Sequence, residues 1–232
     1  MFLVRRTWHA VVPRPLRALM FNLRNHIRIL EIETGHFRSA SIDACVDRQG
    51  NPLPWYTYPT IEYLKQLDFS GKDIFEYGAG NSTLFWAGVG RSVLSIEDNP
   101  GWYEKVKHGI EGRPNCEIKL ITDKTAYIQE ISRHSGFDVI VVDGSYRLEC
   151  AGQAVANLRP GGMIILDNAD RFIKSSQYFR DAGLIEVDMI GFGPLVAVTW
   201  CTSLFLHRQF NFPPRGTVQP EPGTGSVHQI DE

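Results

Sequence analysis

The sequence IFEYGAGNST at residues 74–83 joins an apolar run to the start of a helical pattern. Its two glycines, Gly78 and Gly80, allow a tight turn and let the backbone approach a bound molecule closely. The turn leads to a helix N-terminus, where free N–H groups favour a negative or carboxylate-bearing ligand. A Gly-x-Gly turn alone does not identify that ligand, because any strand-to-helix corner can use one. The residues around the turn make it informative.

A strand-then-helix alternation runs outward from this turn. The expected strands are residues 73–77, 92–97, 117–121, 138–143 and 163–167, with helices near 82–88, 100–110, 124–134, 146–158 and 170–181. This alternation predicts a parallel sheet covered by helices on both faces. Two further strands, 184–190 and 196–206, have no helical pattern between them and should pair antiparallel. The expected fold is α/β, a doubly wound, mostly parallel seven-stranded sheet with a reversed last strand and an N-terminal helical extension.

Two acidic residues near the turn narrow the choice of ligand. Glu76 lies two residues before Gly78, where a carboxylate can meet the ammonium end of a cofactor. Glu97 ends the next expected strand and suits a bidentate grip on ribose hydroxyls. A dinucleotide site wants a third glycine where this chain has Thr83, and Glu76 would repel the phosphates of NAD. The pattern therefore favours S-adenosylmethionine over NAD.

Residues 73–206 resemble class I S-adenosylmethionine-dependent methyltransferases in the order of their motifs. In that family the E/DxGxG loop holds the methionine part of the cofactor. The resemblance implies that Asp123 meets the adenine amino group and that Asp143 lies beside the transferred methyl. The implied cofactor-binding residues are Glu76, Tyr77, Gly78, Gly80, Asn81, Ser82, Glu97, Asp98, Asp123 and Asp143.

Several stretches resemble a group of small bacterial methyltransferases of mostly undefined substrate, some of them in surface-glycan or secondary-metabolite functions. These stretches are PWYTYP (54–59), EYGAGNSTLFWA (76–87), GFGP (191–194) and CTSLF (201–205). The resemblance implies an enzyme, and we expect it to methylate a hydroxyl of a small molecule or glycan. Two alternatives stay open: an N-methyltransferase of an amine or peptide, and a non-catalytic module that binds the cofactor or a partner.

Oxygen donors follow two strands that should be neighbours. Asp143 ends the fourth strand, and Asp167 and Asn168 end the fifth. This set resembles the Mg²⁺ ligands of catechol-type O-methyltransferases, in which the metal lowers the pKa of the acceptor hydroxyl. The alternative is that Asp143 touches the cofactor while Asp167 and Asn168 cap the helix expected near Asp170.

The residues after Asp143 differ from the catechol-type pattern, which places a lysine there. Here the chain reads Gly144-Ser145-Tyr146-Arg147, and an arginine stays protonated and cannot act as a base. Arg147 can instead bind a carboxylate, phosphate or sugar oxygen. The candidate catalytic residues are Asp143, Tyr146 and Arg147.

The two ends of the chain differ from its middle. Residues 16–30 carry an apolar helical stripe opposite arginines, which predicts a lid or buttress helix packed on the domain, or else a peripheral membrane or partner contact. The Pro- and Gly-rich residues 209–232 predict disorder. The expected organisation is an extension and linker (1–58), a cofactor-binding domain (59–208) and a tail (209–232).

Composition bounds the partners. The net charge of −2 and pI near 6.4 give no general attraction to nucleic acid. No apolar run approaches the roughly 18 residues of a membrane span, and the N-terminus lacks a secretory signal, so we expect a cytoplasmic protein, with a homodimer left open. Tyr56 and Tyr58 are candidates for a substrate-covering segment, with packing of the linker as the alternative.

Overall fold

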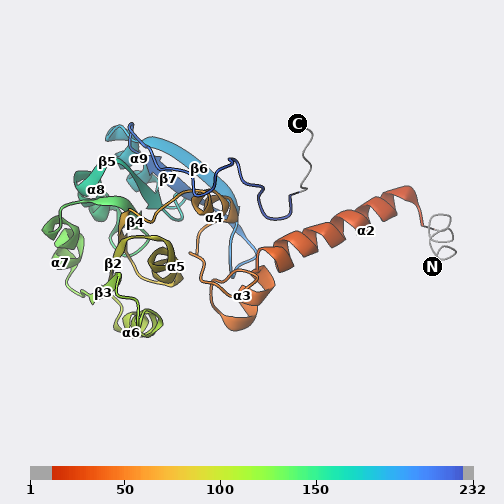
Figure 1. The fold of residues 1–232 in the computed structure, drawn as a ribbon, viewed down its shortest axis with the longest axis horizontal. Coiled ribbons are helices and arrows are strands. Elements are labelled where there is room, and N and C mark those ends of the chain that lie inside the picture. Colours follow the sequence, from red (N-terminus) through yellow and green to blue (C-terminus); the bar gives the residue numbers. More distant parts are fainter. Residues whose placement is uncertain (1–11, 227–232) are drawn as a thin grey trace.

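The computed structural model describes residues 12–226 and is built on one seven-stranded sheet (Figure 1). The strand order is β3-β2-β1-β4-β5-β7-β6, and β7 runs antiparallel to both of its neighbours. The strands are β1 (Asp73–Tyr77), β2 (Ser92–Glu97), β3 (Cys116–Leu120), β4 (Phe137–Val142), β5 (Leu158–Leu166), β6 (Ile185–Phe192) and β7 (Thr199–Leu206). The predicted fold class, including the reversed last strand, is therefore confirmed.

Helices cover both faces of the sheet. Successive residues of a strand point to opposite faces, so each central strand contributes side chains to both helix layers. On β1, Phe75 and Tyr77 join one apolar cluster while Ile74 joins the other. The first cluster packs under α7 (Lys124–Gln129), α8 (Arg147–Asn157) and α9 (Ile173–Asp181). The second packs under α4 (Tyr58–Lys65) and α5 (Asn81–Val89). The central strands are thus buried on both faces, as their continuous apolar runs require.

The remaining helices lie at the sheet edge and in the N-terminal extension. At the β3 edge lies α6 (Pro100–Gly109), and the 3₁₀ turn η2 (Glu130–Arg133) follows α7. The extension holds α2 (Arg14–His26), the π-helical η1 (Ile27–Glu33) and α3 (His36–Ile42). No helix within residues 12–226 has the length and apolar character needed to cross a membrane.

Several element boundaries differ from the sequence expectation, and two of these differences lie next to the β4–β5 edge of the site. Strand β5 begins at Leu158 rather than near residue 163, because Leu158 already pairs with Phe137, and the regular pairing with β4 resumes at Met163 after a register shift. Helix α9 begins at Ile173 rather than near residue 170. The residues between β5 and α9 form turns instead, and Asn168 takes a left-handed backbone conformation (φ 53°).

Helix α2 does not pack on the domain. It projects away from the sheet and its helices (Figure 1), and neither α2 nor η1 has a buried residue. The expectation of a lid or buttress helix is therefore wrong. Its apolar stripe is real, but the stripe faces solvent.

The tail is ordered as far as it is described. Phe212 is buried in the second apolar cluster, and Pro214 forms an isolated bridge with Leu67 at the end of α4. Further on, Thr224 bonds both carboxylate oxygens of Glu62. The expected disorder is wrong for residues 209–226, because backbone hydrogen bonds and single aromatic anchors hold the segment without any periodic pattern. Residues 227–232 lie outside the described residues.

Candidate functional site

A pocket of about 680 Å³ opens at the carboxyl ends of the central parallel strands. It lies where the strand order reverses between β1 and β4, the usual ligand position in an open α/β sheet, and its size suits a small-molecule ligand. The strand-end residues that line it are Gly78, Ala79, Gly80, Asn81, Ser82, Glu97, Asp98, Asp143, Gly144, Ser145, Asp167 and Asn168. The sequence placed most of these residues in one site, and the structure brings them together.

The floor of the pocket is a backbone contact between the β1 and β4 loops. Gly78 has φ +91°, and a Cβ there would lie 2.8 Å from the Cα of Gly144. A Cβ on Gly144 would in turn lie 2.7 Å from the Gly78 nitrogen. Both positions therefore need glycine for the fold itself.

Gly80 has a different reason to be glycine. Its backbone is fully extended (φ −178°), and a Cβ there would meet no protein atom closer than 3.9 Å. Because Gly80 lines the pocket, the space that a side chain would take belongs to the ligand. The loop thus has the form of a cradle that holds a closely approaching molecule.

Glu76 lies beneath this loop rather than in the pocket. Its carboxylate is fully buried and accepts hydrogen bonds from the hydroxyls of Thr83 (2.7 Å) and Ser95. Thr83 also accepts a bond from the Gly80 N–H (3.1 Å), so it connects Glu76 to the glycine turn. This contact explains why threonine stands where a dinucleotide site has glycine. Burial raises the pKa of Glu76 to about 7.

Glu97 lies at the end of β2 with its carboxylate facing the pocket. Its oxygens accept backbone N–H bonds from Ala79 (3.0 Å), Asp98 (3.1 Å) and Asn99 (2.9 Å). These bonds fix the carboxylate beside the glycine turn. A carboxylate so held is preorganised to accept hydrogen bonds from a pair of vicinal hydroxyls.

Trp102 on α6 forms a wall of the pocket that the sequence did not reveal. Its indole N–H donates to the Ala79 carbonyl, and Lys105 lies 4.5 Å over its ring. Asn99 caps the helix, because its side-chain oxygen accepts a hydrogen bond from the backbone N–H of Trp102. This bond sets the position of Trp102. An indole beside Glu97 offers a flat apolar surface next to a hydroxyl-binding carboxylate. The available signal was a tryptophan one turn into the helix after β2.

Asp143 and Arg147 form an ion pair at the end of β4. The Arg147 guanidinium lies 2.8 Å from Oδ1 of Asp143 and also donates to the backbone carbonyls of Asp143, Gly144 and Asp167. Its plane lies 4.2 Å over the Phe172 ring. Burial and the nearby Asp167 carboxylate raise the pKa of Asp143, and Arg147 opposes that shift.

The Asp167 side chain is held by hydrogen bonds from β7 and does not cap a helix. Its Oδ1 accepts from the indole N–H of Trp200 (2.9 Å) and from the hydroxyl of Thr202. Burial raises its pKa to about 6. The capping alternative is wrong because the following helix begins at Ile173, after Asn168 has turned into a left-handed conformation.

The oxygen donors at this edge do not fit Mg²⁺. A cation already lies between the two loops, since Arg147 contacts the side chain of Asp143 and the carbonyl of Asp167, and the Asp167 carboxylate is committed to Trp200 and Thr202. Within residues 12–226, no three His, Cys, Asp or Glu side chains are grouped so that they could hold a metal ion. The structure therefore does not support the metal set of Asp143, Asp167 and Asn168.

The outer half of the pocket is apolar and aromatic. Its lining comes from the extension and linker, from the β6–β7 loop and from the segment after β5: Asp43, Ala44, Cys45, Trp55, Arg171, Leu195, Val196, Val198 and Trp200. Asp43, Asn168 and Leu195 adopt left-handed backbone conformations, a strain that concentrates at functional sites. The nine lining residues of this part were not predicted as site residues, because they lie outside the strand-end motifs.

Besides Glu76, three predicted site residues lie outside the pocket. Tyr77 points into the core and donates to the Ile128 carbonyl (2.8 Å). Asp123 is exposed and caps α7 through the Ala126 N–H. Tyr146 is exposed, with Lys124 over its ring. The structure therefore places none of the three side chains where it would line the site.

The linker tyrosines do not line the pocket either. Tyr56 is fully buried in the second apolar cluster, and Tyr58 lies against His36. Packing, the alternative considered for both, is what the structure shows. The neighbouring Trp55 lines the pocket instead.

Comparison with solved structures places this arrangement in a known fold. The precorrin-6y C5,15-methyltransferase from Geobacter metallireducens superposes with a TM-score of 0.52 at 12% identity, covering 72% of this chain and 96% of that one. The Aeropyrum pernix fibrillarin, solved with natively bound S-adenosyl-L-methionine, has a TM-score of 0.50 at 14% identity, covering 62% and 72%. The chain has the class I methyltransferase fold.

Sequence comparison alone does not reach this methyltransferase fold. No protein-family model matches the chain, and no curated protein matches it. The sequence identities to these solved structures are only 12% and 14%, so the structural similarity establishes the fold and not the acceptor. The pocket residues must carry any further conclusion.

Proposed function

We propose that the protein is an S-adenosylmethionine-dependent methyltransferase. The observation that carries this proposal is Gly80, an extended glycine that the fold does not require, next to the preorganised carboxylate of Glu97. Together they support close approach of a ligand with ribose hydroxyls at the switch point of the sheet. Trp102 would then lie beside the adenine base of the cofactor, and the Gly78–Ser82 loop would hold its methionine part. When bound, the cofactor supplies an electrophilic methyl group.

The acceptor would occupy the outer half of the pocket. Trp55 and Trp200 offer indole surfaces there, and Leu195, Val196 and Val198 offer aliphatic ones. Arg171 adds a positive charge at the same mouth. Such a lining suits a small ring-bearing molecule or a sugar, since both present flat apolar faces edged with polar groups. We therefore propose a small-molecule or glycan acceptor.

The proposed reaction is O-methylation. An acceptor oxygen attacks the methyl carbon, the carbon–sulfur bond breaks, and S-adenosylhomocysteine leaves. The hydroxyl proton passes to the Asp143 carboxylate, whose raised pKa makes it a stronger base than free aspartate. Arg147 holds that carboxylate in place, and alignment of the two substrates supplies most of the acceleration.

A methyl-transfer assay tests this function. The purified protein is incubated with S-adenosylmethionine and a panel of phenols, hydroxylated metabolites, sugars and amines, and release of S-adenosylhomocysteine is measured. We expect turnover with a hydroxyl acceptor and a loss of about 100-fold or more in kcat for Asp143→Asn. Transfer to amines but to no hydroxyl would contradict O-methylation. Unchanged kcat in Asp143→Asn would contradict the role given to this residue.

A further inference from the structure

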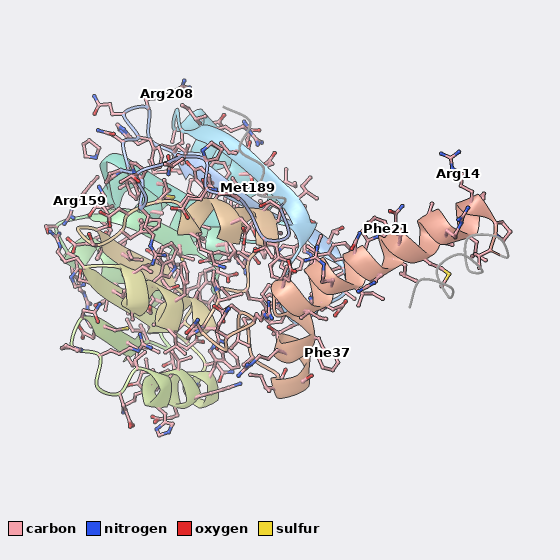
Figure 2. All side chains as sticks on the ribbon, turned by 45° about the vertical axis from the view of Figure 1, so that its right-hand side comes forward. Arg14, Phe21, Phe37, Arg159, Met189 and Arg208 are labelled. Atoms are coloured by element: carbon pink, nitrogen blue, oxygen red, sulfur yellow. The ribbon has the colours of Figure 1, made fainter. Side chains whose placement is uncertain are left out.

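Helix α2 carries an apolar stripe that is left exposed by the rest of residues 12–226. Both views show the helix extending away from the rest of the molecule (Figures 1 and 2), with Phe21 exposed on it. Four exposed apolar residues recur along it with helical spacing, Leu16, Leu19, Met20 and Leu23, and Ile27 at the start of η1 continues the row. At about 100° per residue they fall within roughly one quarter of the helix surface. An exposed contiguous stripe of this kind marks an interaction surface.

Charge along the same helix is entirely positive. The chain holds six arginines and no acidic residue before Glu31, which leaves 18 of its 24 lysines and arginines against all 26 aspartates and glutamates. Arg14, Arg24 and Arg28 are exposed in the structure, and Arg28 also pairs with Glu33. Arg24 and Arg28 lie together on one flank of the apolar stripe, because they are one helical turn apart. Residues 1–30 are thus basic, and the remainder of the chain is acidic.

We propose that α2 binds an anionic membrane surface. The helix would lie along this surface with its apolar stripe inserted between the lipid headgroups. A helix with an apolar face, an arginine flank and low overall hydrophobicity is typical of this binding mode. The arginines would meet the phosphates of anionic lipids, and the acidic body would be held off the surface. The projection of the helix lets it reach a membrane without moving any part of the pocket.

Two other occupants fit the helix less well. A second copy packed stripe to stripe would bring two arginine rows together, and α2 contains no acidic residue to neutralise them. A nucleic acid would satisfy the arginines but leave the leucines in water. An anionic membrane is the partner that satisfies both faces.

Vesicle flotation of the full-length protein tests the proposal. Vesicles of phosphatidylcholine alone are compared with vesicles that also contain phosphatidylglycerol. The variants are Leu19→Ser with Leu23→Ser in the stripe, Arg24→Gln with Arg28→Gln on the charged flank, and Ala18→Ser with Asn22→Ser on the opposite side as the matched control. All six positions are exposed, so the melting temperature should not change in any variant.

The expected results separate the two faces of the helix. The unaltered protein should bind anionic vesicles at least roughly tenfold more tightly than neutral ones, and salt should weaken this binding. The leucine variant should lose roughly tenfold or more on both vesicle types. The arginine variant should lose roughly tenfold on anionic vesicles only. The control should bind as the unaltered protein does.

Three outcomes would overturn the proposal. The first is no flotation with anionic vesicles. The second is flotation that the leucine variant leaves unchanged. The third is a dimer in sedimentation without lipid that the leucine variant dissociates, because the stripe would then belong to a second copy. None of these results depends on methyltransferase activity.

Discussion

At the scale of single residues, Glu76 and Thr83 set the shape of the glycine turn. The buried Glu76 carboxylate accepts from Thr83, whose oxygen in turn accepts from the Gly80 N–H. Among residues 12–226, Oε1 of Glu76 has no hydrogen-bond partner. The residue therefore positions the loop, at the cost of burying an incompletely satisfied carboxylate.

The pH dependence of stability tests this account of Glu76. Its folded pKa of about 7 lies above the ordinary value of 4.5, so the folded state binds the proton more tightly than the unfolded state. The residue thus destabilises the fold progressively as pH rises from about 4.5 to 7. Relative to Glu76→Gln, the unaltered protein should lose stability across this window, by up to about 3 kcal/mol above pH 7. Urea denaturation at pH 5 and pH 8 measures this difference, and an equal difference at both would contradict it.

Sequence reasoning at this scale worked where spacing along the chain fixed the position. Gly78 and Gly80 follow β1, Glu97 ends the neighbouring strand β2, and all three line the pocket. It failed for Tyr77, although strand alternation already places Tyr77 on the face opposite Glu76. Trp102 was missed because helix periodicity does not show which side chain folds back over a neighbouring loop.

At the scale of elements, Arg147 clamps the end of β4 to the end of β5. Its guanidinium bonds the Asp143 carboxylate and the carbonyl of Asp167. Replacement by methionine keeps an unbranched apolar stem but removes the guanidinium and leaves Asp143 without its cation. We predict that Arg147→Met lowers the free energy of unfolding by about 3 kcal/mol, measured by chemical denaturation. A change below about 0.5 kcal/mol would show that the clamp contributes nothing.

The same clamp predicts the response to metal removal. Because Arg147 supplies the positive charge between these loops, EDTA should leave both S-adenosylhomocysteine affinity and turnover unchanged. Addition of Mg²⁺ after EDTA should likewise have no effect. Loss of turnover in EDTA that Mg²⁺ restores would contradict the donor geometry.

The tail is the element that sequence composition described wrongly. Phe212 packs edge-on against Phe69 (5.6 Å between ring centroids) and stacks on Phe210 (4.8 Å). We predict that Phe212→Ala costs about 3 kcal/mol of stability. Val218→Ala, at a position that is 71% exposed, serves as the control and should cost less than about 0.5 kcal/mol. Equal thermal stability of the two variants would mean that the tail is not part of the fold.

At the scale of the whole molecule, the sequence predicted the layers well and the outlying segments poorly. Strand and helix periods report burial against a sheet, so β1 and β2 were located residue by residue. The same periodicity in α2 led to the wrong prediction of a helix packed on the domain. An apolar stripe shows that one face of a helix needs a partner, but it does not show what that partner is. The outer pocket depends on the β6–β7 loop and the linker, whose positions follow from the tertiary fold alone.

The central claim is that the glycine turn and Glu97 form an S-adenosylmethionine site. Calorimetric titration of S-adenosylhomocysteine into the unaltered protein, Gly80→Ala and Gly88→Ala tests it most directly. A Cβ fits at Gly80 and at Gly88 without displacing a protein atom, but only Gly80 lines the pocket. We predict that the unaltered protein and Gly88→Ala bind S-adenosylhomocysteine, and that Gly80→Ala binds it at least roughly tenfold more weakly at an unchanged melting temperature. No binding by the folded, unaltered protein, or equal affinity in all three, would contradict this claim.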